Sequence, residues 1–242
     1  MPLLALAVLA DAGPPNAAQL IRNAIAAGAA QGQKNEKFTF LEDEEREGEK
    51  KRTYDNVMLE GENYRKLILI DGKPLDAKTA KKVDDDLEKT RQQRKHHQVG
   101  FHKEIHDSTL DQVARLFDSK VTGEEVVNGR KAWRVESEPK PGLKGANSQE
   151  EEVLATRRIT WFDEEDGVEV RSRSTYFRNA HQIQAGNEME AESSKVGDSW
   201  HITSFRFHAN VKFFPGIGVK GDVLYRYYEF KRFAVDATFT PN

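Results

Sequence analysis

The sequence predicts an α+β protein, mainly antiparallel β, that forms a curved incomplete β-barrel covered by an N-terminal helix and a helical insertion. Two observations carry this prediction. From Lys37 onward, aromatic and β-branched residues recur in short runs, a composition that favours strands. The dipeptides Asp71-Gly72, Asn128-Gly129 and Asp166-Gly167 separate several of these runs and favour tight reversals between antiparallel strands.

Residues 1–12 have the pattern of a signal peptide or its remnant. An apolar run from Leu3 to Ala10 leads into Ala10-Asp11-Ala12, which fits the small-x-small rule for signal-peptidase cleavage. The basic residues that normally precede the apolar run are absent before Arg22, so a complete signal peptide and a hydrophobic remnant both stay open. Later stretches fall short of the roughly 18 to 20 apolar residues that span a bilayer. We therefore expect an exported, periplasmic protein with no transmembrane span in the mature chain.

A single domain is expected over residues 16–239, and it begins with a helix. Asn16 can cap this helix, and Leu20, Ile21 and Ala24 fall on one apolar stripe that should lie on the sheet. Three strands then form a meander between residues 37 and 70. The last of them ends in an apolar run, 67–70, that is expected to be covered from both sides.

Residues 76–118 predict a helical insertion of two helices. The first carries only a narrow apolar stripe between dense charges, whereas Leu110, Val113 and Leu116 give the second a stronger buried face. We expect the two helices to lie together over the mouth of the half-barrel as a lid.

Strands resume after the insertion. Asn128-Gly129 predicts a two-residue hairpin of the primed type. Residues 139–152 show no periodicity and read as a mobile loop. Long strands are expected near residues 180–192, 199–213 and 222–233.

Composition and charge exclude several classes of protein. Lys and Arg total 37 against 40 Asp and Glu, a formal charge of −3, which argues against nucleic acid as a partner. The absence of cysteine from the sequence excludes disulfides, thiol catalysis and cysteine-built zinc sites.

Candidate catalytic and metal-binding motifs are weak. His102 and His106 have the i, i+4 spacing of a helical metal site, but no Glu follows His102, so the zincin motif is missing. The glycines at 216–221 match a dinucleotide-binding pattern, yet a strand follows them instead of a helix. Acidic runs such as 42–47 are typical of solvated strand ends. The sequence therefore predicts no cofactor, no metal and no enzymatic activity.

Aromatic residues are the remaining functional signal, with 13 Phe, 6 Tyr and 3 Trp. They fill an ordinary core or line an apolar cavity between the sheet and its helices. Phe213 and Phe214, beside a predicted loop tip, are candidates for contact with a membrane or a partner protein. The candidate cavity residues are assigned by strand position: Leu67, Leu69, Trp133, Trp161, Phe205 and Phe207.

Five sequence blocks carry a resemblance to a known family: LEGENYRKLILIDGKPL, VVNGRKAWRVESEPKPG, RRITWFDEEDGVEVRS, VGDSWHITSFRF and YYEFKRFAVDATF. They resemble uncharacterised exported bacterial proteins related to outer-membrane lipoprotein-sorting proteins. The order of elements is similar to that of the LolA/LolB-like superfamily of periplasmic lipoprotein carriers. The resemblance implies a half-barrel that holds acyl chains in an apolar cavity without catalysis.

The resulting hypothesis is a non-enzymatic periplasmic binding or carrier protein for a lipid or a lipoprotein acyl chain, with envelope proteins and the membrane surface as further candidate partners. One alternative is a structural or protein-interaction module of the cell envelope with a filled core. A second is a metal- or carboxylate-dependent hydrolase.

Overall fold

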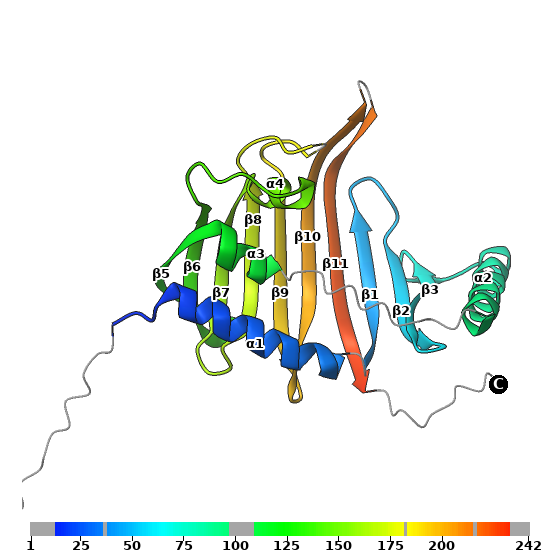
Figure 1. Cartoon of the computed structure of the whole chain (residues 1–242). Helices are drawn as coiled ribbons and strands as arrows, with labels where there is room; N and C mark the ends of the chain where they lie inside the picture. Colours follow the sequence, from blue (N-terminus) through cyan, green and yellow to red (C-terminus); the bar gives the residue numbers. More distant parts are fainter. Residues whose placement is uncertain (1–12, 36–37, 97–108, 182, 215–216, 233–242) are drawn as a thin grey trace, which may run out of the picture.

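The computed structural model describes residues 13–35, 38–96, 109–181, 183–214 and 217–232, so the predicted export segment lies outside the described residues. The chain forms one 11-stranded antiparallel sheet with four helices (Figure 1). The strands are β1 Phe38–Arg46, β2 Arg52–Leu59, β3 Glu62–Ile70, β4 Lys73–Pro74, β5 Phe117–Val127, β6 Arg130–Pro139, β7 Thr156–Asp163, β8 Glu169–Tyr176, β9 Glu188–Val196, β10 Ser199–Phe214 and β11 Ile217–Arg232. The helices are α1 Ala17–Asn35, α2 Ala77–His96, α3 Thr109–Leu116 and α4 Ser148–Val153.

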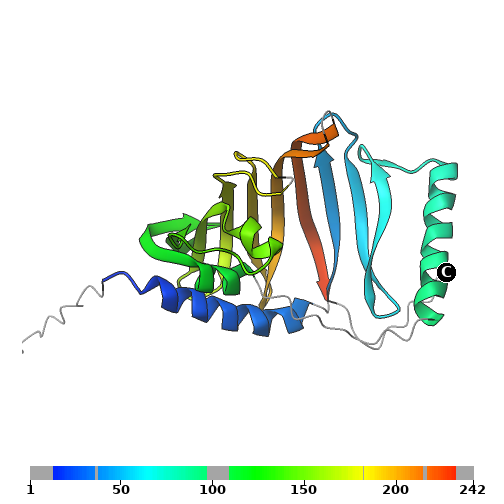
Figure 2. The ribbon, with the colours of Figure 1, turned by 45° about the horizontal axis from the view of Figure 1, so that its top comes forward.

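Two meanders join in the middle of this sheet. The strand order is β4-β3-β2-β1-β11-β10-β9-β8-β7-β6-β5, so every neighbour is consecutive in sequence except β1 and β11. The first and last long strands therefore pair, with Glu44 opposite Tyr225. The sheet is curved and unclosed, with β4 and β5 at its two ends (Figures 1 and 2). This confirms the predicted fold class.

The tight turns follow from their dipeptides. Asp71-Gly72 and Asn128-Gly129 both have positive φ at both residues, 52° and 70° in the first and 50° and 79° in the second. Positive φ at both central positions defines the type I′ turn, whose twist matches that of the flanking strands. The primed hairpin predicted at Asn128-Gly129 is confirmed.

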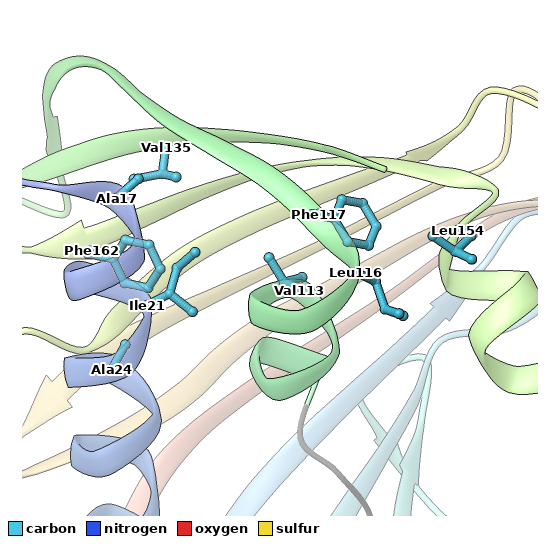
Figure 3. Packing of buried hydrophobic residues seen from close by; sticks show 9 residues of the cluster. All are labelled: Ala17, Ile21, Ala24, Val113, Leu116, Phe117, Val135, Leu154 and Phe162. Carbon is cyan, nitrogen blue, oxygen red and sulfur yellow. The ribbon is translucent and has the colours of Figure 1, made fainter. Parts of the chain in front are cut away.

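Helix α1 lies across one face of the sheet, as predicted, and we call this face the helix face. Asn16 caps it by accepting a hydrogen bond from the Gln19 N–H at 3.2 Å. Ile21 and Ala24 are each 2% exposed. The main core cluster joins α1, α3 and strands β5 to β7 (Figure 3), and its residues are Ala17, Ile21, Ala24, Val113, Leu116, Phe117, Val135, Leu154 and Phe162.

The two helices of the insertion separate. Helix α3 packs on α1 and β5, whereas α2 stands beside β3 at the other end of the sheet (Figure 2). Arg94 ties α2 to the β2–β3 turn by donating to the carbonyls of Leu59, Glu62 and Asn63. The expectation of one lid made of both helices is therefore wrong. The narrow apolar stripe of α2 suits attachment through charges at a sheet end, while the stronger stripe of α3 enters the core.

The predicted loop at 139–152 ends in a helix that the sequence pattern did not indicate. Asn147 caps α4 by accepting from the Glu150 N–H at 2.9 Å. Glu150 in turn accepts from the Ala146 N–H and from Arg115 on α3. Side-chain to backbone bonds, not apolar periodicity, therefore build this turn of helix.

Candidate functional site

Strand register decides which face each predicted cavity residue occupies, because directly opposed residues of antiparallel strands share a face. Phe205 is opposite Ala191 on one side and Tyr225 on the other. Phe207 is opposite Met189 and Val223. Continuing across the strands from Ala191 leads to Val135 of the main core, so Phe205 and Phe207 lie on the helix face.

The six predicted residues divide between the two faces. Trp133 is opposite Phe162, and Leu67 is opposite Tyr54, so both share the helix face with Phe205 and Phe207. Trp161 is opposite Arg134, and Leu69 is opposite Thr53, which place them on the opposite face. The expectation of a common inward direction is wrong for Leu69 and Trp161. At Leu69 the cause is a bulge that leaves Ile68 unpaired and reverses the alternation.

Trp161 has a specific polar contact, and the histidine and Phe213–Phe214 candidates fall outside the described residues or side chains. Trp161 is 4% exposed, and its indole N–H donates to Glu125 at 2.8 Å, so it belongs to the core of its face. His102 and His106 lie outside the described residues. Phe213 and Phe214 belong to β10, but their side chains are not described.

The helix face beyond α3 and α4 carries a polar cluster that the sequence analysis did not predict. We call it the arginine–glutamate cluster: Glu42, Glu44, Arg46, Arg52 and Arg65. Alternation along β1 directs Glu42, Glu44 and Arg46 to the helix face and Asp43 to the other. Cross-strand pairing places Arg52 of β2 opposite Glu44. It aligns Arg65 of β3 with Asn56, whose amide donates to Glu42.

Arg65 is the centre of this cluster. Its Nε donates to Glu42 at 2.8 Å, and its Nη2 donates to both Glu42 and Glu44. The guanidinium lies over the Tyr54 ring with 3.4 Å to the centroid, a cation–π contact. Arg46 is a second donor to Glu44. Two acids on β1 are thus held by arginines from β1 and β3.

These contacts keep Glu44 ionised. Burial alone would raise the pKa of Glu44, but the hydrogen bonds and charges of Arg65 and Arg46 outweigh it, so the pKa is lowered. On the opposite face burial would likewise raise the pKa of Asp43, and its bonds with Lys51, Thr53 and Tyr228 lower it. Carboxylates of this kind accept hydrogen bonds and do not act as general acids near neutral pH.

Aromatic residues border the cluster on the side of β10 and β11. We call them the aromatic strip: Phe40, Phe205, Phe207, Tyr225 and Tyr227. All five are half-buried. Phe40 and Tyr227 meet edge to face with centroids 5.7 Å apart, and Phe205 and Tyr225 lie 6.3 Å apart. Burial raises the pKa of Tyr227 to about 12, so its hydroxyl stays neutral. The strip combines apolar ring surface with tyrosine hydroxyl groups.

A signal for the arginine–glutamate cluster existed in the sequence. Phe38, Phe40, Glu42 and Glu44 follow one parity, so the apolar face of the predicted strand continues into two acids. Reading the run 42–47 as solvated charge missed this alternation. Glu42 and Glu44 are only 6% and 3% exposed. The partner Arg65 could not be predicted, because its position near these acids depends on the register between β2 and β3.

In the part of the chain that the structure describes, His, Asp and Glu side chains form no group of three or more suited to a metal ion. The helices within the described ranges include none that is both long and apolar enough to cross a bilayer.

No protein-family model matches the sequence, and no curated protein matches it significantly. Solved structures align over most of both chains. A DUF1329 family protein from Desulfovibrio piger is 13% identical, covering 90% of this chain and 95% of its own, with a TM-score of 0.36. A putative outer membrane lipoprotein-sorting protein domain from Vibrio parahaemolyticus is 10% identical, covering 92% and 95%, with a TM-score of 0.38. A LolA superfamily protein from Nitrosomonas europaea is 6% identical, covering 86% and 94%, with a TM-score of 0.30.

Proposed function

We propose that this protein is a non-enzymatic, exported binding or carrier protein that holds an acyl chain of a lipid or a lipoprotein against the aromatic strip. One observation carries the proposal. Five half-buried aromatic side chains lie together on the helix face. Helices α1, α3 and α4 lie on the same face of the sheet (Figure 1). A binding site of this kind needs apolar surface and few polar contacts.

The energetics suit an acyl chain. Covering roughly 100 Å² of apolar ring surface contributes about 2.5 kcal/mol, at about 25 cal/mol per Å². Phe205 and Phe207 stand two residues apart on one strand and offer adjacent rings on the helix face. An alkyl chain laid along β10 would contact both rings, while the Tyr225 ring opposite Phe205 borders it.

A carboxylate-dependent hydrolase receives less support from the same residues. Glycoside hydrolysis needs one carboxylic acid with a raised pKa beside an ionised one. The pKa of Glu44 is lowered instead, and both Glu42 and Glu44 already accept hydrogen bonds from Arg65. The buried acids of β1 are therefore paired with arginine and are not arranged as the acid and base of a hydrolase.

Displacement of a fluorescent apolar probe, N-phenylnaphthylamine, by palmitate tests the proposal on the full chain. We expect palmitate to displace the probe from the natural protein and F205A and F207A to bind palmitate at least roughly 10-fold more weakly, because each substitution removes ring surface. F177A is the matched control, since Phe177 is 43% exposed and lies outside the aromatic strip. Absence of palmitate binding, or equal loss in F177A, would reject the acyl-chain site in favour of the protein-interaction module.

A further inference from the structure

We propose that the arginines of the arginine–glutamate cluster bind the anionic head group of the amphiphile whose chain lies on the aromatic strip. This inference rests on the proposed function and adds to it the class of ligand: an acyl or alkyl chain that ends in a carboxylate or a phosphate. Arg46, Arg52 and Arg65 would be the residues that select this head group.

The arginines and the aromatic rings lie in the same cross-strand rows. In the first row Phe205 is opposite Tyr225, Tyr225 is opposite Glu44, and Glu44 is opposite Arg52. In the next row Phe207 is opposite Val223, which is opposite Arg46. Neighbouring strands are about 4.8 Å apart, so roughly 10 to 15 Å separate the rings of β10 from the arginines of β1 and β2. One amphiphile can contact both groups.

The acidic side chains of the cluster are more deeply buried than its arginines. The side chains of Glu44 and Glu42 are 3% and 8% exposed, whereas those of Arg46, Arg52 and Arg65 are 40%, 42% and 38% exposed. Glu42 and Glu44 therefore lie beneath the guanidinium groups of Arg46 and Arg65 and hold them in place, whereas Arg52 pairs with the exposed Glu49. A ligand that approaches the helix face meets the cationic groups first.

Each arginine keeps donors for an anion. Within the described residues Arg65 uses Nε and Nη2 for Glu42 and Glu44, and its Nη1 makes no hydrogen bond. Arg46 uses Nε for Glu44 and reaches the Tyr225 hydroxyl at 3.5 Å through Nη2. Arg52 pairs at 3.2 Å with Glu49, whose side chain is 47% exposed. A planar guanidinium with remaining donors matches carboxylate and phosphate oxygens.

Stacking orders the central arginine in advance. The Tyr54 ring supports the Arg65 guanidinium at 3.4 Å, and the Tyr225 ring lies 5.9 Å from it. A guanidinium already fixed by two carboxylates and a ring loses little freedom when an anion binds. Tyr225 also belongs to the aromatic strip, so Arg65 lies next to that strip.

The test compares ligands with one chain and different ends: palmitate, hexadecyl phosphate and hexadecanol, each displacing N-phenylnaphthylamine from the full chain. We expect both anions to bind at least roughly 10-fold more tightly than hexadecanol, as charge-assisted hydrogen bonds imply. R46Q and R52Q should remove most of this advantage, so that the two anions lose more affinity than hexadecanol does. R226Q is the control, because Arg226 is 50% exposed on the opposite face, where it pairs with Glu45.

The outcomes separate the two proposals. Equal affinity for the three ligands would overturn the head-group site and leave the acyl-chain site standing. Failure of all three ligands to bind would overturn both. Equal weakening by R226Q and R52Q would show a general effect of net charge and overturn the head-group site. Loss of palmitate binding in inorganic phosphate, without any binding of hexadecanol, would identify a free anion as the ligand and overturn the amphiphile.

Discussion

The ion pair between Arg130 and Asp163 offers a direct measurement of what burial adds to a charge pair in this sheet. Arg130 donates to Asp163 from Nε at 2.6 Å and from Nη2 at 2.8 Å, and it also reaches Glu165 at 3.0 Å. The Asp163 side chain is 1% exposed, whereas that of Glu165 is 77% exposed. One guanidinium thus contacts a buried and a solvated carboxylate, and the substitutions Asp163→Asn and Glu165→Gln compare them.

We expect D163N to lower the free energy of unfolding by about 3 kcal/mol, the lower end for a broken buried pair, because Arg130 retains contacts with Glu165 and Asp166. Asp163 also accepts from the backbone N–H groups of Glu165 and Asp166, at 3.1 and 2.7 Å. E165Q should change the free energy of unfolding by less than about 0.5 kcal/mol, as exposed pairs do.

Urea unfolding followed by circular dichroism measures both variants. The pKa of Asp163 is lowered from its ordinary value of 3.8, because Arg130 and the backbone N–H groups outweigh the effect of burial. A lowered carboxyl pKa stabilises the fold above that ordinary value, and the contribution is lost as the pH falls through the folded-state pKa. The difference between D163N and the natural protein should therefore shrink in acid. Equal losses in D163N and E165Q near neutral pH would refute the assignment of the stability to burial.

Three further changes test other parts of the fold. F162A should lower the free energy of unfolding by about 3 to 5 kcal/mol in urea titrations, because Phe162 is fully buried in the main core; a loss below about 1 kcal/mol would contradict this. His201 is 4% exposed between the rings of Phe38 and Phe230, its Nε2 has no partner within the described residues, and burial lowers its pKa from 6.5. As the pH falls, His201 takes up a proton in the unfolded protein before it does so in the folded protein, so the free energy of unfolding should fall below pH 6.5. H201F should flatten this pH dependence in melting curves. An unchanged pH dependence would contradict the role of His201. N147A should destabilise α4 by about 1 kcal/mol, measured by hydrogen exchange of its amides, with N147D as the control that retains an acceptor; equal exchange in both variants would reject the cap.

Local features of the fold could be predicted from local residues. The turns at Asp71-Gly72 and Asn128-Gly129 have the positive φ that these dipeptides favour. The apolar stripe of α1 predicted that Ile21 and Ala24 are buried, and the position of Asn16 before the helix predicted that it caps α1. Such features depend on residues within a turn or two of one another, so the amino-acid pattern is sufficient.

The candidate site was only partly predictable. Phe205 and Phe207 share the helix face as their spacing indicates, because no bulge interrupts β10 between them. Leu67 and Leu69 have the same spacing, but the bulge at Ile68 sends them to opposite faces. A period of two therefore predicts a shared face only where the ladder is regular, and a bulge depends on the partner strand.

Short-range amino-acid patterns specify the strand-rich fold class, the reversals and the amphipathic helices. Long-range packing sets three other features: β1 pairs with β11, α2 lies apart from α3 at the far end of the sheet, and two acids of β1 are buried under Arg65. Alternation states which side chains share a face, but it does not state which strand lies beside which. The cost of burying Glu42 and Glu44 is offset by a partner about twenty residues away.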